Sequence, residues 1–247
     1  MKKALSFLLL ITIILSITAC GTSGESGINS SAHSGSGSAA IGESTAESSS
    51  SDAGTNASET IDETGETESG HILVAYFSWA DNAVLAEDVD AVASPSVISP
   101  GNVQQLAGWI QEETGGDLFS IRVTDPYPSD WDDCLARANR ERGDNARPEL
   151  AGNVENLAQY DTVFLGYPNW WYGVPMPLLS FLEQNDLSGK QVYLFCSHGT
   201  GGLARSVEII SDAAPNALIS DNIFDCYEED AASSQGDIQN WVSGLGY

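Results

Sequence analysis

The segment that decides the fold reads Thr162-Val-Phe-Leu-Gly-Tyr-Pro-Asn-Trp-Trp-Tyr-Gly-Val-Pro-Met-Pro177. It opens with an apolar, strand-like run, and residues 178–182 continue it with apolar side chains spaced as on one face of a helix. Residues 166–177 hold three adjacent aromatic residues, three prolines and two glycines. Ligands of open α/β sheets bind beyond the carboxyl ends of the strands. We therefore expect this loop to hold a flat, partly apolar ring; the alternative is a surface loop whose aromatic side chains only cap the sheet.

The rest of residues 71–247 repeats this alternation of strand-like and helix-like patterns. The apolar runs are continuous, as is typical of strands buried on both faces. Strands separated by helical segments imply βαβ units and a parallel sheet, and right-handed crossovers place helices on both faces. The sequence predicts an α/β three-layer sandwich with a five-stranded parallel sheet of order 2-1-3-4-5. The expected strands are 71–77, 118–123, 162–165, 191–196 and 218–224, and the expected helices are 101–114, 131–142, 175–184, 202–212 and 236–243.

A second loop follows the first expected strand and has the features of a phosphate site. The helix after it opens at Gly101, Asn102 and Val103. A helix N-terminus presents unpaired N–H groups and the positive end of the helix dipole. Ser78 and Asn82 follow the strand and would add side-chain donors. Such a site needs no Lys or Arg. The alternative is an ordinary strand-to-helix turn with Asn102 as its cap.

A third loop follows the fourth expected strand and reads Cys196-Ser-His-Gly-Thr-Gly-Gly202. Its three glycines let backbone amides approach the polar edge of a ring closely. His198 is a candidate general acid, and the alternative is that it only hydrogen-bonds the loop. The sequence has neither a Ser/His/Asp set nor the spacing of a metal site, so we expect no metal.

The first twenty residues have the pattern of a secretory signal. Lys2 and Lys3 precede an apolar run from Ala4 to Ile17, which is too short to span a membrane. The small residues before Cys20 resemble the lipobox of bacterial lipoproteins. That resemblance implies cleavage before Cys20 and attachment of lipid to its sulfur; the alternative is an ordinary signal with a chance cysteine.

Residues 21–70 have the composition of a disordered tether. They contain 14 Ser, 9 Gly and 6 Thr, with no aromatic residue, Lys or Arg. Such a segment cannot bury enough apolar surface to offset its ordering entropy. We therefore expect a signal peptide (1–20), a tether (21–70) and one domain (71–247). The protein would be extracytoplasmic and held to the bacterial cell membrane by its lipid.

The charge of the domain limits its partners. Residues 71–247 contain 26 acidic and 7 basic residues, a net charge of −19. Phosphate contacts need clustered Lys and Arg, so nucleic acid is excluded as a partner. Strong acidity would suit docking to a basic protein, although a solvated acidic surface explains it equally. Three cysteines remain after Cys20, an odd number that argues against a disulfide framework; a bridge between Cys134 and Cys226 stays open.

Together these motifs resemble the flavodoxin-like family. The resemblance rests on Val74-Ala-Tyr-Phe-Ser78, Gly101-Asn102, Gly166-Tyr-Pro-Asn-Trp-Trp171 and Phe195-Cys-Ser-His198, and it spans residues 71–247. It is strongest to bacterial proteins with the Gly-Tyr-Pro-Asn-Trp-Trp loop. It implies noncovalently bound FMN, with the phosphate on the first loop and the isoalloxazine between the other two. The implied phosphate contacts are Ser78, Asn82, Gly101, Asn102 and Val103; the implied ring contacts are Pro168, Asn169, Trp170, Trp171 and Gly173 on one side and Ser197, His198, Gly199 and Gly202 on the other.

The resemblance implies an FMN-dependent oxidoreductase, of the quinone- or flavin-reductase type, or an electron carrier. Its partners would be a redox protein or a small acceptor such as a quinone or another flavin. The phosphate loop departs from the family pattern. About twenty residues interrupt it, Asp81 adds a negative charge, and Val103 stands where flavodoxins have a threonine. A second hypothesis is therefore a non-catalytic ligand-binding or interaction lipoprotein that kept the scaffold and lost FMN.

Overall fold

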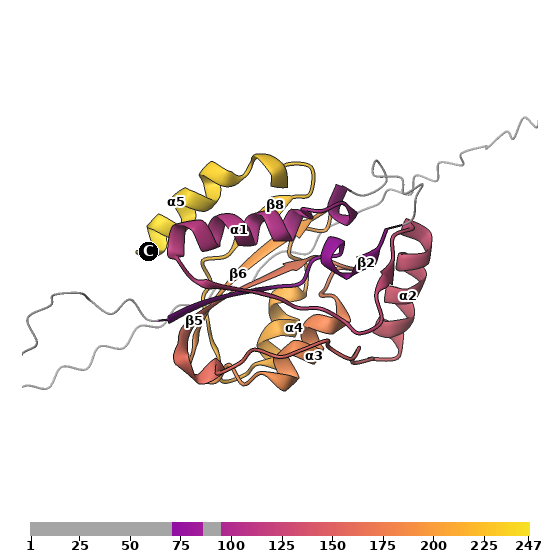
Figure 1. Ribbon diagram of the computed structural model, residues 1–247, viewed down its shortest axis with the longest axis horizontal. Helices are drawn as coiled ribbons and strands as arrows, with labels where there is room; N and C mark the ends of the chain where they lie inside the picture. The colour runs from indigo at the N-terminus through magenta and orange to yellow at the C-terminus, as the bar shows by residue number, and fades with distance from the viewer. Residues whose placement is uncertain (1–70, 86–94) are drawn as a thin grey trace, which may run out of the picture. The chain divides into compact units, whose positions relative to one another are not determined.

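The computed structural model describes residues 71–85 and 95–247, which form a parallel sheet between two layers of helices (Figure 1). The order along the sheet is β3-β1-β5-β6-β7, and β8 also pairs with β6, always in parallel. This confirms the predicted α/β three-layer sandwich of order 2-1-3-4-5, with the fifth position shared by two short strands. The strands are β1 (His71–Tyr76), β3 (Asp117–Ser120), β5 (Tyr160–Pro168), β6 (Gln191–His198), β7 (Leu218–Ile219) and β8 (Phe224–Tyr227).

Helices cover both faces because successive side chains of a strand point to opposite sides of the sheet. In β1, Ile72 and Val74 pack with residues of α1 and α5, whereas Leu73 and Ala75 share a core with residues of α3 and α4. Figure 1 shows α1 and α5 on one face of the sheet and α3 and α4 on the other. Each expected helix is present. The helices are α1 (Asn102–Thr114), α2 (Trp131–Gly143), α3 (Met176–Gln184), α4 (Ser206–Ala213) and α5 (Gln235–Leu245), and the short 3-10 turns are η1 (Ala80–Asn82), η2 (Pro95–Val97), η3 (Leu157–Gln159) and η4 (Ala231–Ser233).

The centre of the sheet is closely packed at Gly166. This residue lies opposite Phe195 in the register of β5 and β6. A β-carbon at Gly166 would lie 2.2 Å from carbons of the Phe195 ring. The ring therefore occupies the space that any larger residue would need, which explains why the loop of residues 166–177 begins with a glycine.

The second expected strand, 118–123, is shorter in the structure. β3 ends at Ser120, and the N–H of Val123 donates instead to the side-chain oxygen of Asn82 (2.8 Å). The chain then forms β4 (Tyr127–Pro128), which pairs with β2 (Ala83–Val84) in a second small parallel sheet. This pairing draws two loops together beside the carboxyl edge of the main sheet.

The prediction of the fifth strand, 218–224, was wrong about where the strand runs. β7 ends at Ile219, and Ser220-Asp221-Asn222 interrupts the strand, with the N–H of Asn222 donating to the hydroxyl of Ser220 (3.1 Å). Ser, Asp and Asn favour turns because their side chains bond to nearby backbone. β8 then continues along β6 to the edge of the sheet, with Tyr227 opposite His198. The fourth helix also begins later than predicted, at Ser206.

The predicted signal peptide, tether and lipid-bearing Cys20 lie outside the described residues. Within residues 71–85 and 95–247, no helix has both the length and the apolar character needed to cross a membrane. In the same part of the chain the three cysteines are buried and unpaired: Cys134, Cys196 and Cys226.

Candidate functional site

Three loops meet beyond the carboxyl ends of β1, β5 and β6 and enclose a cleft of about 220 Å³. This is the edge at which parallel α/β sheets bind ligands. The cleft brings together most of the predicted site residues, namely Ser78, Asn102, Val103, Pro168, Asn169, Trp170, Trp171, Ser197, His198 and Gly199. Four other predicted residues do not line it: Asn82, Gly101, Gly173 and Gly202.

One wall of the cleft is aromatic, and Trp170 is its anchor. The Trp170 ring packs edge-on against Tyr127 (5.4 Å between ring centroids), Phe77 (5.5 Å) and Trp79 (6.4 Å). Edge-to-face geometry at these separations is favourable for aromatic pairs. Since Phe77 and Tyr127 are buried, the orientation of Trp170 is set by the core.

Trp171 and Tyr172 form a tight turn with left-handed backbone. Their φ angles are 56° and 60°, and the N–H of Gly173 closes the turn by donating to the carbonyl of Trp170 (3.0 Å). Positive φ at both central positions normally selects Gly, Asn or Asp, and costs other residues about 1–2 kcal/mol each. Two bulky aromatic residues in such a turn indicate a functional constraint.

Contacts from two arginines hold this turn in place. A guanidinium nitrogen of Arg142 donates to the carbonyl of Trp171 (3.1 Å), and the backbone N–H of Arg205 donates to that of Tyr172 (3.2 Å). The turn is therefore fixed to α2 on one side and to the start of α4 on the other.

The aromatic wall is hydrogen-bonded to the end of β6 and to the loop after it. The N–H of Asn169 donates to the carbonyl of Ser197 (2.9 Å), and its side-chain amide donates to the carbonyl of Gly202. The Tyr172 ring lies against Gly201, where a β-carbon would be 3.0 Å from two ring carbons. Gly202 thus supports the wall through its carbonyl, although it does not line the cleft. Gly173 is buried and does not line the cleft either.

His198 lines the cleft, and its role as a proton donor stays a prediction. Its Nε2 lies 2.8 Å from a carboxylate oxygen of Asp225, and its Nδ1 lies 2.8 Å from the carbonyl oxygen of Gly199. Both ring nitrogens are therefore engaged within the protein. The alternative reading, in which His198 hydrogen-bonds the loop, fits these contacts.

The predicted phosphate end combines the start of α1 with Ser78. Asn102 and Val103 line the cleft in the first turn of α1, where backbone N–H groups lack partners within the helix. The Asn102 side chain is used inside the protein, because it donates to the carbonyl of Glu228 (2.8 Å). Gly101 lies behind this surface: a β-carbon there would be 2.6 Å from the Ser78 hydroxyl oxygen.

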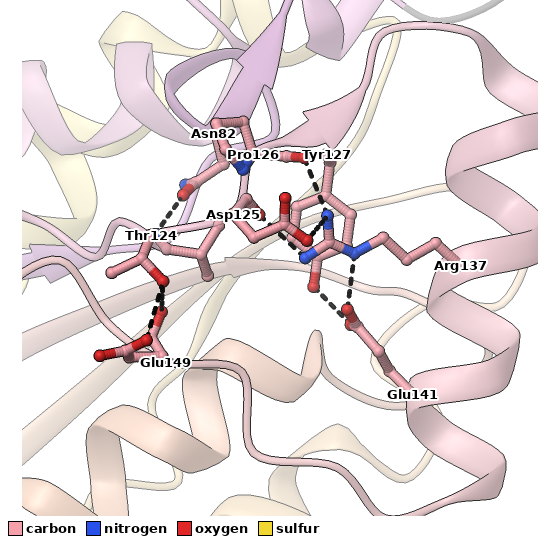
Figure 2. Close-up of polar contacts among 9 residues, drawn as sticks. Asn82, Thr124, Asp125, Pro126, Tyr127, Arg137, Glu141 and Glu149 are labelled. Atoms are coloured by element: carbon pink, nitrogen blue, oxygen red, sulfur yellow. Dashed lines mark hydrogen bonds and ion pairs between the residues drawn. The ribbon is translucent and has the colours of Figure 1, made fainter.

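The prediction that Asn82 donates to a phosphate was wrong. Its amide nitrogen donates to the carbonyls of Ser78 and Ile121 (2.9 Å each), and its oxygen accepts from Val123 (2.8 Å). Both polar groups of the side chain thus hydrogen-bond within the protein and link the loop after β1 to the chain after β3. Figure 2 shows Asn82 turned toward the chain after β3.

Asp81 does not line the cleft, so its charge does not face the phosphate end. Its carboxylate accepts from the Ser120 hydroxyl (2.6 Å) and lies 3.9 Å from the Arg122 guanidinium. Burial raises the pKa of the nearby Tyr76 to about 12, and the Asp81 charge adds to this effect. The departure from the family pattern at Asp81 is therefore compensated locally.

The structure adds cleft residues that sequence reasoning missed: Trp79, Ser96, Trp131, Tyr172, Thr200, Gly201 and Glu228. Four of them, Trp79, Tyr172, Thr200 and Gly201, are next to predicted residues in the sequence, and this adjacency could have indicated them. Glu228 was missed because β8 runs beyond the predicted strand end. Trp131 lies at the start of α2, and no sequence pattern connected it with the site.

Fold and cleft together define a doubly wound α/β protein with a ligand site at the carboxyl edge of its sheet. A family model described as flavodoxin matches residues 89–245. The chain therefore belongs to the flavodoxin family.

Solved structures are similar to this chain. A candidate flavoprotein from Bacteroides eggerthii DSM 20697 is 25% identical, over 72% of this chain and 98% of that chain, with a TM-score of 0.54. A candidate flavoprotein from Bacteroides uniformis ATCC 8492 is 23% identical, over 70% and 98%, with a TM-score of 0.55. A flavoprotein in complex with FMN from Lactobacillus acidophilus NCFM is 16% identical, over 68% and 99%, with a TM-score of 0.49. No curated protein matches the chain.

Proposed function

We propose that this protein binds FMN noncovalently in the cleft and acts as a flavin-dependent oxidoreductase or electron carrier. One observation carries the proposal: an aromatic wall and a helix N-terminus face the same cleft. Trp170 and Trp171 offer flat surfaces against which an isoalloxazine can stack. The first-turn N–H groups at Asn102 and Val103 suit a phosphate. Membership of the flavodoxin family supports the same ligand.

The residues present fit this cofactor. Among the described residues that line the cleft there is no Lys or Arg, so backbone N–H groups and the Ser78 hydroxyl would hold the phosphate. The backbone of residues 197–201 would face the polar edge of the ring. Bound FMN would supply the redox chemistry, and the protein supplies orientation and a local electric field. His198 would keep the loop after β6 in shape rather than transfer a proton.

The partner of such a flavin would be a redox protein or a small acceptor, such as a quinone or a second flavin. The net charge of −19 over residues 71–247 would favour a basic protein surface. Reductase chemistry of the quinone or flavin type and simple electron carriage both fit a cleft that is open to solvent.

The protein would be anchored on the outer face of the cytoplasmic membrane by lipid on Cys20, with residues 21–70 as a tether. The motif before Cys20 supports this placement. Replacement of the attachment residue, Cys20→Ser, should move the protein from the membrane fraction to the soluble fraction. Equal membrane retention of both proteins would contradict lipid attachment.

The decisive experiment is a titration of the full chain with FMN. We expect the flavin fluorescence to be quenched, its absorption bands to shift, and saturation to occur at one FMN per chain. A protein that leaves the fluorescence and spectrum of added FMN unchanged would contradict the proposal.

Two observations favour the second hypothesis, a binding lipoprotein that has lost FMN. Asn82 makes structural bonds rather than facing a phosphate, and Val103 lacks a hydroxyl. Loss of one hydrogen bond to a charged group weakens binding by about 1.5–3 kcal/mol, or roughly tenfold to more than a hundredfold. The same FMN titration separates the two hypotheses.

A further inference from the structure

A second, smaller pocket of about 90 Å³ opens beside the cleft, between α2 and the aromatic wall. We call it the tryptophan pocket. It shares four tryptophans and Asn169 with the cleft, and only two of its residues are its own, Cys134 and Leu135 of α2. A ligand in this pocket would thus contact the same indole rings as a ligand in the cleft. The shared tryptophans are Trp79, Trp131, Trp170 and Trp171.

The tryptophan pocket is apolar in an otherwise acidic domain. None of its lining residues in the described part of the chain carries a charge. The indole N–H of Trp79 already donates to the carbonyl of Pro128 (3.0 Å), so this ring offers its carbon surface. Trp131 is 47% exposed, which leaves a large apolar ring at the mouth. Aromatic ligands gain from such faces beyond the area they bury, whereas an anion would lose its hydration without a partner.

The volume limits the size of the ligand. A closed apolar cavity of about 150 Å³ takes up benzene. The tryptophan pocket is smaller but open, so it suits one six-membered ring whose far edge remains outside. A long or branched ligand would have to extend into the cleft or into solvent.

The thiol in the pocket, that of Cys134, does not react with an electrophilic ligand at neutral pH. Cys134 is buried, and burial raises the pKa of its thiol to about 12. The thiolate is the nucleophilic form of cysteine. At neutral pH the side chain therefore acts as a small apolar group and would not add to a quinone.

We propose that the tryptophan pocket binds an uncharged, planar ring compound of the quinone class. Binding rests on the pocket alone. That this compound is the small acceptor of the flavin rests on the proposed function. The pocket would then give that acceptor a binding site beside the cleft.

The test uses the full chain and two probes with the same ring system. Menadione is uncharged, and 1,4-naphthoquinone-2-sulfonate is anionic. Isothermal titration should give micromolar binding of menadione and at least tenfold weaker binding of the sulfonate. Leu135→Asp places a charge in the pocket, and Leu135→Phe fills it. Each variant should weaken menadione binding at least tenfold and leave the dissociation constant of FMN within twofold.

A matched control is Leu218→Asp, since Leu218 is 57% exposed on β7 and lines neither cavity. It should leave both ligands unaffected. If Leu135→Asp fails to fold, as judged by circular dichroism, Leu135→Phe decides the result. No menadione binding, equal binding of the two probes, or wild-type binding by the folded Leu135 variants would each overturn the proposal. If FMN does not bind but menadione binding still depends on Leu135, the proposed function fails and the pocket assignment stands.

Discussion

The guanidinium of Arg137 lies over the ring of Tyr127, with its central carbon 4.0 Å from the ring centroid. The same guanidinium donates to Glu141 (2.7 Å) and to the carbonyls of Pro126 (2.8 Å) and Asp125 (2.9 Å), as Figure 2 shows. The Tyr127 hydroxyl donates to the other oxygen of Glu141 (2.5 Å). Because the Tyr127 ring also packs against Trp170, α2 is linked through this cluster to the aromatic wall of the cleft.

Replacement of Arg137 by lysine should destabilise the protein despite keeping the charge. An ammonium cannot bond at once to Glu141 and two carbonyls as the planar guanidinium does. We expect a loss of about 1.5–3 kcal/mol in the free energy of unfolding, the range for hydrogen bonds to charged groups. Urea unfolding measures it. The matched control is Arg205→Lys, since the Arg205 pair with Glu208 is exposed and its loss should leave the midpoint unchanged. Equal midpoints for the two variants would contradict this role of Arg137.

The buried tyrosines predict a loss of stability at alkaline pH. Burial raises the pKa of Tyr76 to about 12, and burial also raises the pKa values of Tyr127 and Tyr167. Above pH 10 the unfolded state therefore binds fewer protons than the folded state, so the free energy of unfolding falls as pH rises. Each such tyrosine should remove about 1.4 kcal/mol between pH 9 and pH 11.

Urea unfolding at pH 9 and pH 11 tests this prediction, with Tyr127→Phe as the diagnostic variant. The variant lacks the Tyr127 hydroxyl, so its stability should fall by about 1.4 kcal/mol less than that of the wild type over the same interval. Parallel pH dependence in the two proteins would refute the contribution of Tyr127.

The fold could be predicted from the sequence because its signals are local and repeated. Apolar runs such as 71–77 and 191–196 are buried in the sheet, and the helix patterns between them require parallel crossovers. Strand ends were predicted less well. The interruption at residues 220–222 depends on turn-forming side chains, and the end of β3 depends on Asn82, whose partners are 39 and 41 residues away.

The site could be predicted only where it follows directly from strand ends. Trp170, Trp171 and Ser197 come immediately after β5 or at the end of β6, and they line the cleft. Trp131 reaches it through the packing of α2, which is a tertiary relationship. Asn82 has the residue type of a phosphate donor, but its side chain is hydrogen-bonded to the distant backbone groups of Ile121 and Val123.

The left-handed turn predicts an unusual order of stabilities at Tyr172. Tyr172 is 66% exposed, and Tyr172→Ala and Tyr172→Gly lose the same ring, but only alanine keeps a β-carbon at positive φ. We expect the glycine variant to be more stable than the alanine variant by about 1 kcal/mol in urea unfolding. Glu112, which is exposed in α1, is the control: there glycine should be less stable than alanine by about 1 kcal/mol. The same order at both positions would count against strain in the turn.

Of the two tryptophans, Trp171 tests contact with the FMN ring with less effect on stability than Trp170. Trp170 packs against three aromatic rings, so Trp170→Ala should weaken FMN and also lower stability. Trp171→Ala should raise the dissociation constant of FMN about tenfold, which corresponds to loss of an aromatic contact worth roughly 1.4 kcal/mol. Fluorescence titration with FMN measures both effects, and urea unfolding separates them. Wild-type affinity in both variants would refute contact between the ring and this wall.

The acidic residue of the cleft should lower the reduction potential of bound FMN. Glu228 lines the cleft, and one of its carboxylate oxygens would lie 3.6 Å from a β-carbon at Gly199. A nearby negative charge disfavours the anionic reduced flavin. Glu228→Gln removes this charge and should raise the midpoint potential by on the order of 30 mV, the equivalent of about 1.4 kcal/mol for a two-electron couple.

Spectroelectrochemical titration of the FMN-loaded protein measures this shift, with Glu113→Gln as the control. Glu113 lies in α1 near the end opposite to Asn102, roughly 16 Å along the helix axis. This separation exceeds the screening length of about 8 Å at physiological ionic strength, so the control should leave the potential unchanged. A further rise of the Glu228→Gln shift at low salt would support a Coulomb origin. An unchanged or lowered potential in Glu228→Gln would show that the Glu228 carboxylate does not act on the flavin.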